Sequence, residues 1–297
     1  MQVNVIPFRH EDTATWTYLV HASGDAAAAV IDPVLDYDAA SGEASTGSAA
    51  RVLAAAEAAG LRIDWILETH AHADHLSAAA WLRERTGARV AIGAGIVQVQ
   101  HTFKDRLHLD DQDFVADGRQ FDHLLNDGEE LQVGALTVLA VATPGHTADS
   151  MSYVVGDAVF VGDTLFSPAS GSARCDFPGG DAHALYRSVH RLYELPVTRM
   201  FLCHDYPAAG TAPRAEVPVS EQRAQNIHLR DGVSEAEFVA MRTTRDAGLA
   251  VPRLLWPSLQ VNIRAGHLPE AESNGGRYLR LPVRLREASA DGAQSGG

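Results

Sequence analysis

The stretch Thr69-His70-Ala71-His72-Ala73-Asp74-His75 places three imidazoles and one carboxylate within a few residues. An apolar run at residues 63–68 precedes it directly and is typical of a buried strand. Alternate side chains of an extended segment point the same way, so those of His70 and His72 share one side. Once the chain turns, Asp74 and His75 can return towards the same point. Because neutral imidazole and carboxylate suit zinc and iron, the stretch predicts a metal site.

The composition is that of a globular protein with an acidic surface. The chain has 297 residues, of which 46% are hydrophobic and 21% charged, with a net charge of -14. No run of about 18 apolar residues is present, so a membrane-spanning helix is not expected. A nucleic-acid partner is not expected either, because binding to its phosphates depends on clustered Lys and Arg. The first residues show no basic segment followed by an apolar core, so a cytoplasmic location is expected.

The order of predicted elements is β-rich, then mixed, then β-rich again. Strands are predicted at residues 3–6, 15–20, 27–31, 63–68, 89–92, 130–133, 136–141, 151–155, 158–161 and 200–203. Helices are predicted at residues 49–59, 76–85, 181–194, 220–226 and 234–246. Residues 36–48 have a loop composition, and residues 98–127 have no clear periodicity. Residues 254–263 and 277–283 are predicted as late strands or extended arms.

Three further polar groups stand where an apolar strand ends. His146 follows the turn Thr143-Pro144-Gly145, Asp163 follows the run 159–162, and His204 follows the run 201–203. If these strands lie side by side, their ends gather at one edge, where the binding sites of layered α/β proteins usually form. The set is therefore predicted to join the site of His70.

The motifs THAHADHLS, TPGHT, FVGDTLF and FLCHDY, in this order, resemble those of the metallo-β-lactamase-fold superfamily. The resemblance covers about residues 3–283 and implies an α/β fold, the four-layer αββα sandwich. It places seven side chains around one or two metal positions: His70, His72, Asp74, His75, His146, Asp163 and His204. We expect one domain at residues 1–287, with a helical and extended arm from about residue 216, and a disordered tail at residues 288–297.

A second resemblance narrows the family. The segments ARCDF and FLCHDY, together with residues 219–269, look like those of the persulfide dioxygenases, which are related to glyoxalase II. Such enzymes hold one Fe(II) with two histidines and one aspartate. Carried onto this chain, the resemblance makes His70, His146 and Asp163 the metal ligands and catalytic residues. It leaves the remaining four side chains around them or at a second metal position: His72, Asp74, His75 and His204.

The activity implied by this resemblance is the oxidation of glutathione persulfide by O₂ to sulfite and glutathione. Glutathione carries two carboxylates, so a basic lining is expected in an otherwise acidic protein. The candidates for substrate binding are Arg174, then Tyr186, Arg187 and Arg223. For Arg174, an ion pair with Asp176 that only orders its loop is an equally good interpretation. Cys175 is a redox candidate, although a small buried residue is the favoured interpretation.

Several alternatives remain at this point. A zinc-dependent hydrolase of glutathione thioesters, as in glyoxalase II, shares the ligand set and differs in the metal. A metal-dependent persulfide sensor would bind without turnover. The resemblance also implies a homodimer formed through the C-terminal arm. The other histidines lack partners at ligand spacing and are expected to be structural: His10, His21, His101, His108, His123, His183, His190, His228 and His267.

Overall fold

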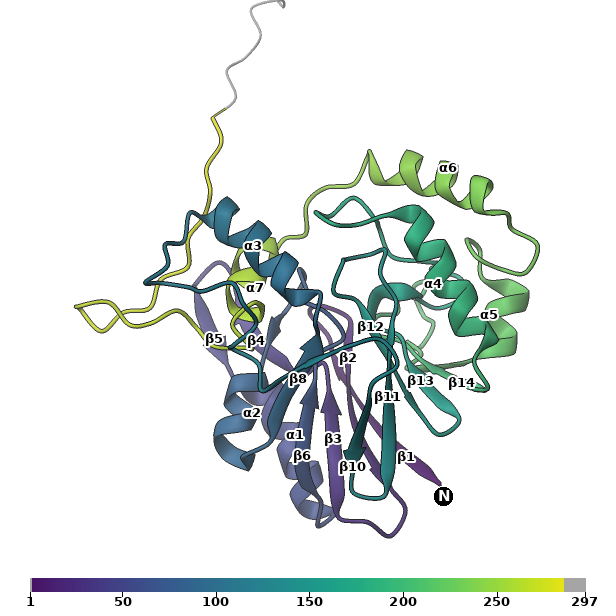
Figure 1. The fold of residues 1–297 in the computed structure, drawn as a ribbon, viewed down its shortest axis with the longest axis horizontal. Helices are drawn as coiled ribbons and strands as arrows, with labels where there is room; N and C mark the ends of the chain where they lie inside the picture. The colour runs from purple at the N-terminus through teal and green to yellow at the C-terminus, as the bar shows by residue number, and fades with distance from the viewer. Residues whose placement is uncertain (1, 286–297) are drawn as a thin grey trace, which may run out of the picture.

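The computed structural model describes residues 2–285, so the predicted tail at residues 288–297 lies outside the described residues. Two mixed sheets face each other in the middle of the molecule (Figure 1). The first has the order β1 (Val3–His10), β2 (Thr15–Ala22), β3 (Ala27–Ile31), β6 (Arg62–Leu67), β8 (Arg89–Gly93) and β9 (His123–Leu125). The second has the order β10 (Glu130–Val133), β11 (Leu136–Ala142), β12 (Met151–Val155), β13 (Ala158–Phe160), β14 (Arg199–Phe201) and β15 (Glu216–Pro218).

Helices cover the outer face of each sheet, which gives the four αββα layers (Figure 1). The first sheet is covered by α1 (Gly47–Ala58), α2 (Ala79–Thr86), α3 (Ile96–Leu107) and α7 (Leu255–Asn262). The second is covered by α4 (Ala182–Glu194), α5 (Val219–Gln225) and α6 (Glu235–Asp246). The predicted fold class is confirmed. Among the described residues, none of the helices combines the length and the apolar character that crossing a membrane requires.

The period of two along each strand distributes the apolar side chains among three buried layers. In β6, Ile66 packs under the helices, whereas Trp65 and Leu67, on either side of it, pack between the two sheets. This central layer is closed from the second sheet by residues such as Tyr153. Because these strands are buried on both faces, the polar residues that follow their ends are attached to well-packed segments at the edge of the sheets.

Two sequence predictions fail in this fold. Residues 254–263, predicted as a strand or an extended arm, form α7. Its buried face uses Leu255, Leu259 and Asn262, which have helical spacing, and Pro257 is tolerated because it lies in the first turn. Residues 36–48, predicted as a loop, contain the end of β4 (Val34–Asp38), β5 (Glu43–Ser45) and the start of α1; β4 also pairs with β7 (Leu76–Ser77).

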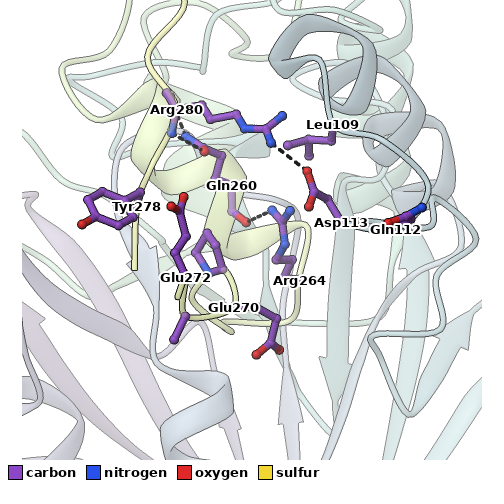
Figure 2. A pocket seen from close by; sticks show the side chains of 11 residues that line it. Leu109, Gln112, Asp113, Gln260, Arg264, Glu270, Glu272, Tyr278 and Arg280 are labelled. Carbon is purple, nitrogen blue, oxygen red and sulfur yellow. Dashed lines mark hydrogen bonds and ion pairs between the residues drawn. The ribbon is translucent and has the colours of Figure 1, made fainter. Parts of the chain in front are cut away.

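The last described segment, residues 266–285, runs as an extended arm over α7. Figure 2 shows how it is fastened: the Gln260 side chain accepts from the Arg280 backbone N–H at 2.7 Å and donates to the Arg280 carbonyl at 2.8 Å. The Arg280 guanidinium pairs with Asp113 at 2.7 Å. A cavity of about 270 Å³ lies between the arm and the body of the protein.

Candidate metal centre

The histidine-rich loop is held by polar side chains from three other parts of the chain. At its start, the Asp32 carboxylate accepts from the Thr69 backbone N–H at 2.7 Å and from its hydroxyl at 2.9 Å. Asp149 then accepts from the Ala71 N–H at 2.8 Å. Both carboxylates are buried, and burial raises their pKa, that of Asp32 to about 6.

The far end of the same loop is held by a single amide from α7. Asn262 donates to the His72 and His75 carbonyls at 2.8 Å each and accepts from the Ser77 N–H at 2.8 Å. Its side chain is buried, so all these hydrogen bonds are shielded from water. The loop conformation therefore depends on a residue almost two hundred positions further along the chain.

His70, His146 and Asp163 converge on one point. Each offers a ligand atom within 4.8 Å of the others. Asp163 Oδ2 lies 3.9 Å from His70 Nε2 and 3.6 Å from His146 Nε2. The three side chains follow β6, β11 and β13, respectively, as expected from the strand ends. The structure thus brings together the three residues predicted to hold the metal.

A second group of donors adjoins the first. His72, Asp74, His75 and His204 also offer ligand atoms within 4.8 Å of one another. His204 Nε2 lies 3.3 Å from Asp74 Oδ2 and 3.3 Å from Asp163 Oδ1, so Asp163 stands between the two groups. His72 Nε2 is 3.0 Å from Asp32 Oδ1. All seven predicted donors therefore lie in one cluster.

The cluster contains an unusual number of buried polar atoms that make no hydrogen bond within the described residues. They include His70 Nε2, both ring nitrogens of His72, Asp74 Oδ2, His75 Nε2, Asp163 Oδ1 and both ring nitrogens of His204. Buried polar atoms without partners are costly and rare in native proteins. A cation bound among these nitrogen and oxygen donors would satisfy them, and the donor set fits zinc or iron.

Burial and the charges in the cluster favour the ligand forms of His70, His72 and Asp74, whereas burial opposes that of Asp163. Burial holds the pKa of His70 and of His72 well below the usual value, so both rings are neutral and carry a free lone pair. Burial alone would raise the pKa of Asp74, yet His204 and His75 hold it well below its usual value. Burial raises the pKa of Asp163, against the opposing effect of His204.

The orientation of His146 is fixed from outside the cluster. Its Nδ1 lies 2.7 Å from the Arg174 carbonyl, which can only accept, so Nδ1 carries the proton and donates. The free lone pair is then on Nε2, which faces Asp163. Phe177 packs edge-on against the His146 ring at 5.2 Å between ring centres. The loop that contains Arg174 therefore sets both the tautomer and the position of this donor.

A cavity of about 420 Å³ opens beside the cluster. Asp74, His146 and Asp163 line it, so a bound molecule can reach the donors. Phe166, Phe177 and other apolar side chains form part of the wall. The remaining lining includes Tyr206, His228 and three arginines: Arg174, Arg242 and Arg245. This cavity shares no lining residue with the one in Figure 2.

The three arginines differ in what they contact. Arg174 forms a two-pronged ion pair with Asp176 and donates to the Ala250 carbonyl, which fits the interpretation that it orders its loop. Arg242 is buried and paired with Asp246. Arg245 is exposed, and within residues 2–285 its side chain makes neither a hydrogen bond nor an ion pair. The Arg245 guanidinium is therefore available to bind a ligand in this cavity.

The other predicted substrate-binding residues do not line the cavity. The Tyr186 hydroxyl donates to the Val233 carbonyl, Arg187 pairs with Glu235, and Arg223 pairs with Asp231. These three side chains instead make contacts between neighbouring segments of the helical layer formed by α4, α5 and α6.

Three further residues line the cavity that the sequence did not predict there: Arg242, Arg245 and His228. The first two sit three positions apart on α6 and therefore share a helix face, a signal that was present in the sequence. His228 was expected to be structural, and it does hold a loop, because its Nδ1 accepts from the Ser172 N–H at 3.0 Å. Burial and the neighbouring Arg242 and Arg245 lower its pKa to about 4, so the ring is neutral.

Both cysteines are buried and free. Burial raises the pKa of the Cys175 thiol to about 12 and that of Cys203 well above its usual value, so both remain protonated at pH 8. Because the thiolate is the reactive form, we expect a disulfide-exchange reagent to label neither thiol of the native protein within minutes at pH 8 and both after unfolding. Rapid labelling that disappears in a Cys175→Ser variant would instead identify a reactive Cys175.

The chain is similar to known proteins over most of its length. The family profile described as "Metallo-beta-lactamase superfamily" matches residues 10–204. A probable metallo-hydrolase of Burkholderia pseudomallei is 50% identical over 91% of this chain and 96% of its own length. The β-lactamase hydrolase-like protein of Xylella fastidiosa is 46% identical over 94% of this chain, which spans only 64% of that protein.

More distant relatives have more specific names. The mitochondrial persulfide dioxygenase ETHE1 of Bos taurus is 30% identical over 86% of this chain and 85% of its own length. A hydroxyacylglutathione hydrolase of Methylococcus capsulatus is 31% identical over 83% and 80%, respectively. Among solved structures, ETHE1 from Myxococcus xanthus superposes with a TM-score of 0.70 at 30% identity, covering 89% of this chain and 100% of that one.

Proposed function

Because the chain belongs to the metallo-β-lactamase superfamily, we propose that it is a persulfide dioxygenase that oxidises glutathione persulfide with O₂. The observation that carries the proposal is a two-histidine, one-carboxylate set, His70, His146 and Asp163, beside a cavity with an available cation. Such a set leaves positions open for O₂ and a substrate sulfur. The similarity to ETHE1 over most of both chains supports the same choice.

The proposed reaction balances without a further reductant. Glutathione persulfide, O₂ and water give glutathione, sulfite and two protons. The S–S bond breaks, and the terminal sulfur forms bonds to three oxygen atoms, two from O₂ and one from water. The terminal sulfur is oxidised: part of the electrons it loses reduce the inner sulfur to the thiol of glutathione, and the rest reduce both atoms of O₂. Iron held by His70, His146 and Asp163 would supply the electron exchange for this reaction, which zinc cannot.

The chain's own residues position the substrate. The apolar wall that includes Phe166 and Phe177 can exclude bulk water from the sulfur end of the cavity. Arg245 offers its guanidinium to a carboxylate of the tripeptide. The Arg174 carbonyl keeps the His146 lone pair on Nε2. The predicted homodimer remains a proposal alongside this activity.

Removing the Arg245 guanidinium should weaken substrate binding. We expect Arg245→Ala to raise KM for glutathione persulfide about tenfold with little change in kcat, because the lost charge-assisted hydrogen bond serves ground state and transition state alike. Steady-state kinetics measures this. Arg230→Ala is the matched control, since Arg230 is exposed nearby but lines a different hollow. Equal kinetics for the two variants would exclude Arg245 from substrate binding.

A zinc-dependent glutathione thioester hydrolase is the second candidate. The observation in its favour is the complete second donor group, His72, Asp74, His75 and His204, adjoining the first. Two zinc ions would lower the pKa of a shared water and supply a nucleophile. The hydroxyacylglutathione hydrolase relative supports this candidate.

The deciding experiment compares two metal forms of one preparation. Protein stripped of metal is loaded anaerobically with Fe²⁺ or with Zn²⁺, and its metal content is measured. We expect the iron form to consume O₂ and release sulfite from glutathione persulfide, and the zinc form to do neither. Rapid hydrolysis of lactoylglutathione by the zinc form, with no O₂ uptake by the iron form, would favour the hydrolase. Persulfide binding without turnover in either form would indicate a sensor.

A further inference from the structure

The loop that orients His146 is itself fastened to α6 by a buried ion pair. Arg242 is 3% exposed and Asp246 is 6% exposed. Arg242 Nε lies 2.9 Å and its terminal nitrogen 2.6 Å from Asp246 Oδ1. Within the described residues, each of the two side chains forms an ion pair with the other and with no further charge. They lie one helical turn apart on the same helix.

Both members of the pair also hold the loop directly. Asp246 Oδ2 accepts from the Cys175 backbone N–H at 2.8 Å, and Arg242 donates to the Ser172 carbonyl at 3.2 Å. Arg174 lies between these two attachment points, and its carbonyl accepts from His146 Nδ1 at 2.7 Å. A continuous set of buried contacts therefore runs from α6 through the loop to a proposed metal ligand.

We infer that Arg242 and Asp246 are positioning residues for the metal centre. By fixing residues 172–175, they fix the carbonyl that selects the His146 tautomer. Neither residue of the pair is among the proposed donors, and although Arg242 also lines the cavity, the contacts that connect the pair to the donors run through the loop to His146. The inference rests on the proposed ligand role of His146. It also places part of the metal centre's support outside residues 10–204, which the superfamily profile matches.

A gain in stability does not by itself account for a buried pair of this kind. Burying two charges costs desolvation that their attraction only partly returns, and apolar replacements of buried pairs are often neutral or stabilising. Removing one partner leaves an uncompensated buried charge and can unfold the protein. The informative variant therefore replaces both residues, Arg242→Met with Asp246→Leu, which removes the charges and the loop contacts together.

For the double variant we expect a nearly unchanged melting temperature and a lower affinity for metal. The double variant should unfold, as apoprotein, at a temperature close to that of the wild type. Its affinity for Fe²⁺, measured anaerobically by competition with a chelator, should fall about 10- to 100-fold, the usual effect of losing a group that orients a ligand. The control double variant Asp117→Ala with Arg119→Ala removes an exposed pair and should leave the affinity unchanged. A folded Arg242/Asp246 variant with wild-type affinity would overturn the inference.

A second variant covers the case in which the double variant does not fold. Arg242→Lys keeps a cation beside Asp246 but lacks the fork that reaches both Asp246 and the Ser172 carbonyl. Nitrogen-15 NMR of the histidine rings in the apoprotein should show His146 as the Nδ1–H tautomer in the wild type and a mixture in Arg242→Lys. An unchanged tautomer with unchanged Fe²⁺ affinity would contradict the inference. Neither readout needs turnover, so a failure of the proposed dioxygenase activity is distinguished from a failure of this inference.

Discussion

Replacing Asp163 by Asn is expected to abolish stable metal binding and to lower kcat/KM by more than about 100-fold, beyond the usual effect of losing a group that only orients a ligand. Asp163 is the one carboxylate in the proposed triad, and its two oxygens face His70 and His146 on one side and His204 on the other. An amide of the same shape keeps the packing but removes the negative charge. Elemental analysis after dialysis measures the effect directly.

Asp74→Asn provides the matched control, because it makes the same change in the adjoining donor group. If one iron is held by His70, His146 and Asp163, the Asp74 variant should retain about one equivalent of iron while the Asp163 variant retains none. Loss of metal from both variants in parallel would mean that the two donor groups act as one dinuclear centre, which would contradict the proposed mononuclear site.

Replacing Asn262 by Ala is expected to lower the free energy of unfolding of the apoprotein by about 3 kcal/mol or more, because it leaves three buried backbone groups without partners. The melting temperature should fall by roughly 5–10 °C. Metal affinity should fall as well, since the loop that carries His72 and His75 loses its attachment. Denaturant unfolding and metal titration measure the two effects.

Asn274→Ala is the control for this variant. Asn274 lies in the arm at residues 266–285 and is exposed, and among residues 2–285 its side chain hydrogen-bonds only with Tyr278 and Gly276. Its replacement should change the free energy of unfolding by less than about 0.5 kcal/mol. Comparable destabilisation by the two replacements would show that the attachment at Asn262 contributes little.

Most of the proposed metal donors could be predicted from the sequence because they directly follow the ends of strands, and strand ends are visible in local sequence patterns. The buried strand before His70 and the runs before Asp163 and His204 are short apolar segments, and polar residues that follow such segments must emerge at a sheet edge. No element was predicted within residues 98–127, although they contain most of α3, because its buried Val99, Phe103 and Leu107 are separated by polar and charged residues over only about three turns.

What could not be predicted are the contacts made between distant parts of the chain. Nothing near Asn262 in the sequence indicates that it binds backbone groups of the loop that begins at His70. The ion pair of Arg174 with Asp176 was one of the two interpretations that the sequence supported, but nothing in the sequence indicates that the Arg174 carbonyl accepts a hydrogen bond from His146. Such pairings depend on tertiary packing, which local patterns do not contain.

The attachment of the histidine-rich loop to α7 also sets the order in which the metal centre can form during synthesis of the chain. A ribosome has made every proposed donor once residue 204 is added, yet the amide that holds their loop is added only at residue 262. Until then, the growing chain carries a group of histidines and carboxylates on a segment that lacks its final support. Because contacts between residues so distant in sequence form slowly, we expect metal to be held stably only after α7 has packed against the loop.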